Sequence, residues 1–145
     1  MADVRKGSGL RLINERTHAP LASVVEIAVS RQDRRRGLLG RHGLDASAAL
    51  MLAPCAAVHT AFMQFALDVV FVDRTGRVRK IVRGLGPWRM SASLGAYAAI
   101  ELAAAGPRDL VPGDRLYLSD GTPDNGVQAL DMAVRTFARA SEAVA

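Results

Sequence analysis

The sequence is short of several residue types on which common functions depend. It contains one cysteine, lysine only at Lys6 and Lys80, and 5% aromatic residues. A single cysteine excludes an internal disulfide and offers no cysteine pair for a structural metal. The sequence also lacks a phosphate-binding loop and a nucleophile elbow. We therefore expect no metal site. The sequence does not indicate which cofactor, if any, the protein uses, and it points to no particular reaction.

Long hydrophobic runs are also missing. Half of the 145 residues are apolar and 23% are charged, which is an ordinary balance for a globular protein. No apolar run approaches the roughly 20 residues of a membrane-spanning helix, and the first ten residues lack the apolar stretch of a secretory signal. We therefore expect a cytoplasmic protein without membrane association, folded as a single domain over residues 1–145.

The charge balance is basic, with a formal net charge of +5. The densest cluster of basic residues is Arg31, Arg34, Arg35, Arg36 and Arg41. On a helix four of these would share one broad face, with Arg36 pointing elsewhere. Such a face suits a bound anion or phosphate, although a plain solvated face is the more common outcome. Aromatic residues are too few to stack on the bases of a single-stranded nucleic acid, so nucleic acid is not the expected partner.

Alternating or short apolar segments predict a chain made mainly of strands. Strands are expected over residues 10–14, 22–29, 48–53, 58–62, 66–73, 77–85, 96–102 and 115–119. The clearest pattern is the hairpin formed by 66–73 and 77–85 around a tight turn at residues 74–76.

Two segments predict helices. Ser30 with Asp33 three residues later is an imperfect capping box, which favours a short helix over residues 31–39. Thr122 followed by a proline starts a predicted amphipathic helix over about 122–142, with an apolar stripe that includes Phe137. The expected fold is α+β, with a mostly antiparallel, strongly bent or barrel-like sheet of six to eight short strands.

Three polar residues lie within apolar strand segments. They are His59, Asp68 and Glu101. A buried carboxylate needs a hydrogen-bond or charge partner, so these residues are candidates for an acid/base pair or, equally, for structural anchors. Cys55 lies four residues before His59, and the two would form a nucleophilic pair only if the intervening loop folded back.

A ligand pocket is expected around the same segment. Arginine and histidine would supply donors for an anionic group, and large apolar side chains would line the walls. The expected ligand-binding residues are Arg34, Arg36, His59, Thr60, Phe62, Met63 and Trp88.

Several ordered motifs resemble a known family. They are RRRGLLGR at 34–41, ALML at 49–52, VHTAFMQFALDVVFVDRTGRV at 58–78, the Pro-Trp pair at 87–88, IEL at 100–102 and the Pro-Gly-Asp turn at 112–114. Together they resemble domain-of-unknown-function family one hundred and ninety-two over about residues 10–119, leaving the C-terminal helix as an extension. The sequence departs from the family pattern at Ala49, at Ala66 and in the spacer between Gly106 and Gly113.

The resemblance implies a compact α+β domain around a bent sheet and no established activity. The polar positions that match the family pattern are Arg34, Arg36, Arg41, His59, Thr60, Asp68, Asp73, Glu101 and Asp114.

Three classes of function are compatible with these residues. The first is a module that binds a small anionic molecule or a peptide. The second is an acid/base hydrolase that uses His59 with Asp68 or Glu101. The third is a structural or assembly factor acting through the C-terminal helix, which could also form a homodimer. We rank binding first, because the polar set is rich in arginine and contains no evident nucleophile.

Overall fold

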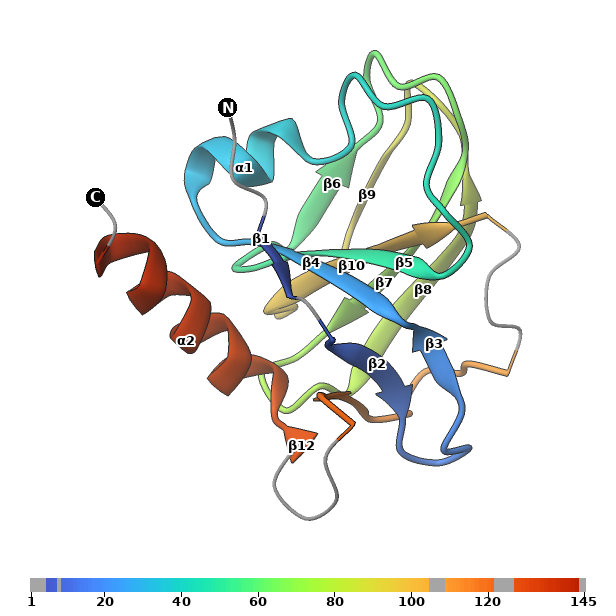
Figure 1. Ribbon diagram of the computed structural model, residues 1–145. Helices are drawn as coiled ribbons and strands as arrows, with labels where there is room; N and C mark the ends of the chain where they lie inside the picture. Colours follow the sequence, from blue (N-terminus) through green and yellow to red (C-terminus); the bar gives the residue numbers. More distant parts are fainter. Residues whose placement is uncertain (1–4, 8, 105–108, 122–126, 144–145) are drawn as a thin grey trace.

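The computed structural model describes residues 5–7, 9–104, 109–121 and 127–143, and strands dominate it (Figure 1). The helices are α1 (Arg31–Arg36) and α2 (Leu130–Ala143). The strands are β1 (Arg5–Gly7), β2 (Arg11–Asn14), β3 (Pro20–Ala22), β4 (Val24–Ala28), β5 (Ala48–Leu52), β6 (Ala57–His59), β7 (Leu67–Val72), β8 (Val78–Leu85), β9 (Met90–Ala92), β10 (Ala98–Ala103), β11 (Leu116–Ser119) and β12 (Val127–Gln128). None of the described helices is long and apolar enough to cross a bilayer.

The largest sheet has six strands in the order β1-β4-β5-β10-β7-β8. Strands β4 and β5 are parallel, and the other described pairs in this sheet are antiparallel. Its central strands are apolar on both faces because both faces are covered. This sheet therefore forms the middle layer between two separate clusters of buried side chains.

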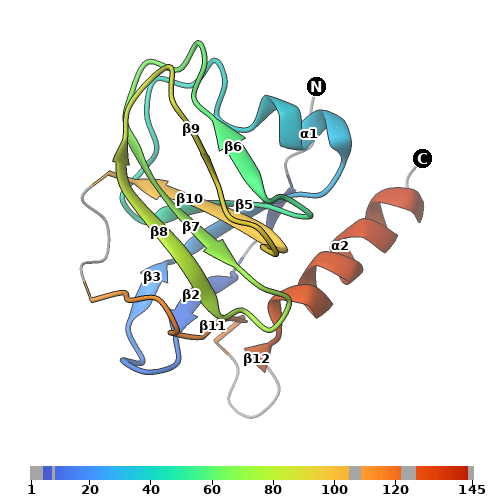
Figure 2. The ribbon, with the colours of Figure 1, turned by 180° about the vertical axis from the view of Figure 1, so that it is seen from behind.

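One face packs against the second sheet and α2. The second sheet has the order β12-β11-β2-β3 and buries Leu12, Leu116 and Leu118 in the same cluster as Met51 and Ile100 of the large sheet. Leu130, Ala133 and Val134 of α2 also lie in this cluster, so this stripe of the helix is buried in the protein's own core, whereas Met132 is exposed. In Figure 2 both helices lie toward the right of the view, with α1 above α2.

The opposite face is covered by α1 and by the two-stranded sheet β6-β9. Leu50, Leu52, Val69 and Phe71 of the large sheet pack here with Leu38, which follows α1. Helix α1 begins where the Ser30 hydroxyl accepts a 3.0 Å hydrogen bond from the Asp33 amide. It ends at Gly37, whose φ of 46° is rare for other residues, and is therefore shorter than the predicted helix over 31–39.

The structure corrects two predictions about the fold. The strands do not form one barrel-like sheet: they divide among three sheets, none of which is closed or strongly curled in the described part of the chain, because β2 and β11 pair with each other and not with the edges β1 and β8. The C-terminal helix begins at Leu130 and not near residue 122, because residues 127–128 pair with β11 instead. Thr122 and Pro123 lie outside the described residues.

Candidate functional site

A pocket of about 440 Å³ lies between α1 and the sheet face that the helix covers. Its size falls within the range of small-molecule sites. The walls come from α1, from the segment that joins β5 to β6, and from β10 beneath. The lining residues are Arg31, Arg34, Arg35, Arg36, Gly37, Leu38, Leu39, Leu52, Pro54, Cys55, Ala56, Ala57, Val58, His59, Met63 and Glu101.

Helix α1 contributes four arginines to this pocket. Arg34 fixes the helix to the opposite wall, since its Nη1 donates a 2.6 Å hydrogen bond to the Pro54 carbonyl and its Nε donates to the Ser30 carbonyl. The side chains of Arg31, Arg35 and Arg36 make no hydrogen bond or ion pair with any other described residue. Arg36 also lines the pocket, whereas the helical spacing predicted that it would point elsewhere.

Glu101 lies among these lining residues and is 5% exposed. Its Oε2 has no hydrogen-bond partner among the described residues. Burial raises the pKa of Glu101 to about 7, and the charge of Arg41 opposes this shift. A carboxyl group with such a pKa exchanges its proton near neutral pH, so it is able to act as an acid or a base.

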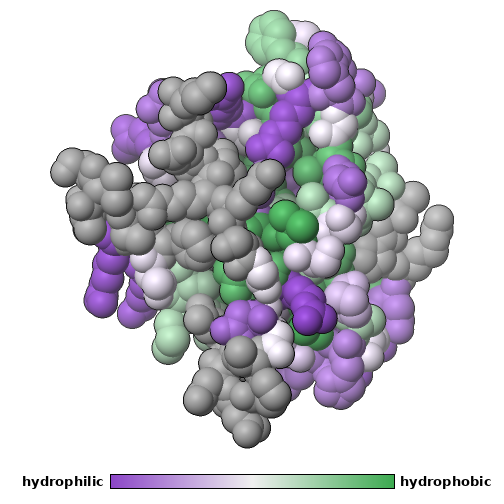
Figure 3. Space-filling view, in the orientation of Figure 1, coloured by the Kyte–Doolittle hydropathy of each residue, from purple (hydrophilic) through white to green (hydrophobic). Residues whose placement is uncertain are grey.

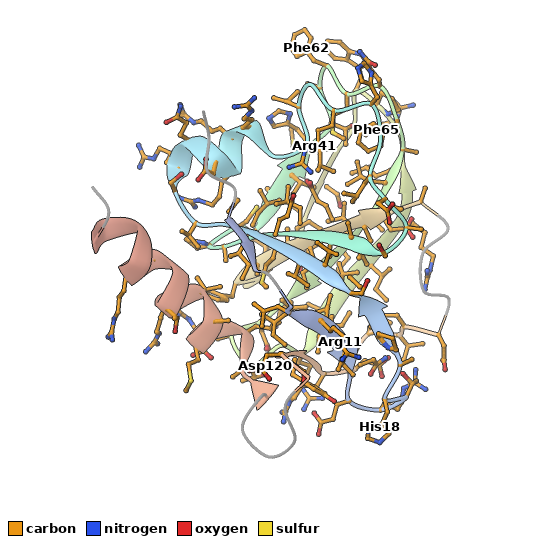
Figure 4. The ribbon with its side chains drawn as sticks, viewed as in Figure 1. Arg11, His18, Arg41, Phe62, Phe65 and Asp120 are labelled. Atoms are coloured by element: carbon orange, nitrogen blue, oxygen red, sulfur yellow. The ribbon has the colours of Figure 1, made fainter. Side chains whose placement is uncertain are left out.

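A second carboxylate lies in the same cross-strand row as Glu101. Both Glu26 of β4 and Glu101 of β10 are paired with Leu50 of the intervening strand, so they project from the same face. Arg41 Nη2 lies 2.9 Å from Glu26 Oε2. Figure 4 shows Arg41 on the loop after α1, on the same side of the sheet as that helix. One arginine thus serves two largely buried carboxyl groups.

Cys55 and His59 line the pocket as well. The Cys55 thiol donates to the Ala57 carbonyl at 3.1 Å, and burial raises the pKa of this thiol. A thiol with a raised pKa is a poor nucleophile at neutral pH. The ring of His59, by contrast, is exposed at the margin of the pocket.

Asp68 does not join this site. It is paired with Leu102, the neighbour of Glu101, and so projects from the opposite face of the sheet. Its Oδ1 accepts a 2.8 Å hydrogen bond from the Gly84 amide, where the register between β7 and β8 shifts. The interaction of Asp68 with His59 that the sequence suggested is therefore excluded by geometry.

Thr60 is buried and holds two loops together. It is 1% exposed, its hydroxyl donates to the Gly86 carbonyl at 2.6 Å, and the same oxygen accepts from the Arg89 amide at 2.8 Å. These bonds join the loop after β6 to the loop before β9. Thr60 therefore positions two loops and does not line the pocket.

Phe62 and Trp88 project from these two loops into solvent. They are 73% and 61% exposed, and their ring centroids lie 4.5 Å apart. Figure 4 places Phe62 at the tip of the molecule, and Figure 3 shows a hydrophobic side chain at this end beside hydrophilic ones. Of the three apolar residues predicted to line the pocket, only Met63 does so.

Two further aspartates of the family pattern hold turns. Asp73 Oδ1 accepts hydrogen bonds from the Thr75 and Arg77 amides in the β7–β8 turn. Asp114 is 5% exposed and binds Arg16 and Asn14 on the far side of the large sheet from α1. Neither residue lines the pocket.

Sequence analysis missed Glu26. It is a charged residue within the apolar segment Val24–Ala28, which is the same signal that singled out Asp68 and Glu101. Its partner Arg41 was assigned to the helical arginine cluster, because the sequence does not reveal that the chain turns back toward the sheet after Gly37.

A second hollow, of about 600 Å³, lies beside β11 and the start of α2. Its two arginines are accompanied by Glu15 and Asp131, and Arg115 Nε lies 4.0 Å from Glu15 Oε2. The pocket beside α1 has four arginines against one glutamate, so it carries the larger excess of positive charge. In the described part of the chain, no group of three His, Cys, Asp or Glu side chains is arranged to hold a metal ion.

Known proteins share the fold. A crystal structure of a Sinorhizobium meliloti protein, provisionally described as a transcription regulator, is similar with a TM-score of 0.65 and 23% identity over 74% of this chain and 89% of that chain. A Novosphingobium aromaticivorans protein of unknown function has a TM-score of 0.63 and 20% identity over 74% and 81% of the two chains. At such identities the likeness establishes the fold alone. No curated protein matches the sequence.

The sequence itself also identifies a family. The model of the DUF192 family, described as "Uncharacterized ACR, COG1430", matches residues 12–118 and leaves α2 outside the match. This confirms the resemblance noted in the sequence. Because the match covers well over half of the chain, the protein belongs to the DUF192 family.

Proposed function

We propose that the pocket beside α1 binds a small molecule through an anionic group. The observation that carries this proposal is the presence of Arg31, Arg35 and Arg36 on the pocket wall without any described partner. Guanidinium groups bind carboxylates and phosphates with paired, charge-assisted hydrogen bonds. Arg34 adds positive charge and holds the wall in place through the Pro54 carbonyl.

The remaining lining defines the ligand's size and character. Leu38, Leu39, Leu52, Val58 and Met63 supply apolar surface next to the arginines. Such a mixture of apolar walls and a few polar groups is typical of sites for small organic molecules. A small organic anion therefore fits better than a bare inorganic ion, which would leave the apolar surface uncovered.

A thermal-shift screen tests this proposal. The purified protein is heated with inorganic phosphate, with sulfate and with a series of small carboxylates and phosphate esters. A ligand at about one hundred times its dissociation constant adds near 2.7 kcal/mol, which raises the melting temperature by several degrees in a chain of this size. The increase should become smaller at high salt, because charge attraction is screened.

Arg36→Ala should weaken the binding of any hit by about tenfold to a hundredfold, as expected for a lost charge-assisted bond. Arg139→Ala is the matched control, because Arg139 is exposed on α2 and removing it changes the net charge equally. If the two substitutions weakened binding equally, the affinity for the anion would depend only on the net charge of the protein, and the proposal would be wrong.

A second candidate function is acid/base catalysis, favoured by the unpartnered carboxyl group of Glu101 in the pocket. In this reading Glu101 transfers a proton to or from a bound substrate, and the His59 imidazole lies on the same lining. Hydrolysis of ester and phosphoester substrates would be assayed against pH for the wild type and for Glu101→Gln. Activity that is unaffected by this substitution would exclude the role.

A further inference from the structure

The charges beneath the pocket are unbalanced. Glu26 and Glu101 project from one face of the sheet on either side of Leu50. Arg41 is the cation that serves both, and it makes its 2.9 Å contact with Glu26. If both carboxyl groups are ionised, one negative charge at Glu101 lacks a close counter-ion. Buried charges are normally paired, so an ionised Glu101 would need a second cation close to it.

The unpaired oxygen also has an acceptor beside it. A Cβ atom at Gly37 would lie 4.0 Å from Glu101 Oε2 and 3.8 Å from the Arg34 carbonyl oxygen. Two acceptor oxygens therefore lie within 4.0 Å of one point beside Gly37, at the end of α1 and on the pocket lining. The C-terminal end of a helix also carries partial negative charge. This corner suits a donor group with positive charge.

A metal ion does not meet this need, because the described residues offer no group of three metal-ligating side chains here. An ammonium group does, since it donates up to three hydrogen bonds and fits a small space. The arginines of α1 line the same pocket and require an anion. The pocket lining thus contains groups that require opposite charges.

We propose that the ligand is a small zwitterion, whose anionic group binds the arginines of α1 and whose ammonium group binds Glu101 and the adjacent Arg34 carbonyl. This inference rests on the anion-binding function proposed above and adds the second charged group of the ligand. It places a compound of the amino-carboxylate or amino-phosphate class in the pocket.

Matched probes test the proposal by isothermal titration calorimetry. One series contains ω-amino carboxylates of increasing chain length, starting with glycine, together with amino acids that have apolar side chains. The other contains the same carboxylates without the amino group. We expect at least one amino compound to bind about tenfold or more tightly than its matched carboxylate. The chain length that binds best then reports the separation of the two subsites.

Glu101→Gln should remove this preference while leaving binding of the plain carboxylate in place. Glu15→Gln is the control, because Glu15 is an exposed carboxylate outside the pocket. Circular dichroism and melting curves would first establish that both variants fold. If Glu101→Gln does not fold, proton release by the wild type provides the second measurement.

An ammonium group that binds Glu101 should displace its proton, and titrations in buffers of different ionisation enthalpy measure that release. The charged or titratable side chains on the surrounding elements are Arg31, Arg34, Arg35 and Arg36 of α1, Arg41, Glu26, Cys55 and His59. Because the imidazole of His59 lines the same pocket, His59→Gln is measured in parallel and should leave the release unchanged.

Failure of this inference differs from failure of the anion site. Carboxylates that bind through Arg36 with no preference for the amino compound, or without proton release, would overturn the zwitterion and leave the anion site intact. Absence of binding by either series, together with no hit in the thermal-shift screen, would overturn both.

Discussion

Glu101 is the residue whose surroundings are least satisfied by the fold itself. Its neighbours in β10 are small or apolar, and its Oε2 lacks a hydrogen-bond partner in the described part of the chain. A residue retained only for stability would normally have its charge or hydrogen bonds satisfied. In the function proposed above, a bound ligand supplies the partner that the described residues do not.

The raised pKa of Glu101, about 7, predicts how stability depends on pH. The folded protein holds the proton more tightly than the unfolded chain, whose glutamate pKa is about 4.3, so stability should fall as pH rises from about 4 to 7. The glutamine in the Glu101→Gln variant cannot ionise, so the variant should lack the part of the pH dependence that comes from Glu101. Melting curves from about pH 4 to pH 8 should show the variant becoming more stable than the wild type, with a difference of a few kcal/mol above neutral pH. Parallel curves for the two proteins would contradict the prediction.

Asp114 shows the opposite behaviour. Hydrogen bonds from Arg16, from the Val111 amide and from Asn14 hold the pKa of Asp114 well below its usual range. The contribution of Asp114 to folding stability is therefore present above about pH 4, and it is lost as the pH falls through the lowered pKa of the folded protein. Asp114→Asn should cost about 2–3 kcal/mol at neutral pH, measured by urea unfolding. Asp109→Asn, which alters a 76% exposed partner of the same Arg16, should cost less than about 1 kcal/mol.

At the scale of elements, the β7–β8 hairpin is the feature that the sequence predicted best. Alternating residues and a short turn sufficed, because both signals are local. The face from which each polar residue projects was not predictable in the same way. Glu101 is paired with Val69, and Asp68 with Leu102, so a register of one residue decides that only Glu101 enters the pocket.

The hairpin turn offers a direct test of how it packs. Gly76 has a φ of +84°, and an added Cβ would collide with the Leu116 carbonyl oxygen. Gly84 in the same hairpin has a φ of +64° and open space around it. Gly76→Ala should therefore destabilise by several kcal/mol, whereas Gly84→Ala should cost about 1 kcal/mol from backbone strain alone. If chemical denaturation showed similar losses of unfolding free energy for the two variants, the collision with the Leu116 carbonyl would not be destabilising and the prediction would be wrong.

At the scale of the whole molecule, sequence patterns predicted most elements but not their assembly. The barrel was wrong because the pairing of β2 with β11 joins segments about one hundred residues apart, and local periodicity does not specify such partners. The start of α2 was misplaced for the same reason, since residues 127–128 pair with β11. A homodimer through the C-terminal helix stays a prediction, although Leu130, Ala133 and Val134 are buried within the protein's own core.

The candidate site was predictable in part. Arg34, Arg36, His59, Met63 and Glu101 were singled out by residue type, and they line one pocket. Phe62 and Trp88 were included because they are large and apolar, but loop geometry fixed by Thr60 turns them into solvent. The apolar wall formed by Leu38 and Leu52 was not distinguishable from core before the layers were known.

The most direct test of the anion site is chemical-shift mapping by nuclear magnetic resonance. Backbone amides of the uniformly labelled protein are followed while inorganic phosphate, and then the best carboxylate from the screen, is added at constant ionic strength. We predict saturable shifts confined to α1, to residues 37–39 and to the segment 54–59, and much smaller shifts in Arg36→Ala. Shifts centred on Arg74 and Arg115 in the other hollow, or scattered over all exposed arginines, would contradict the proposed site.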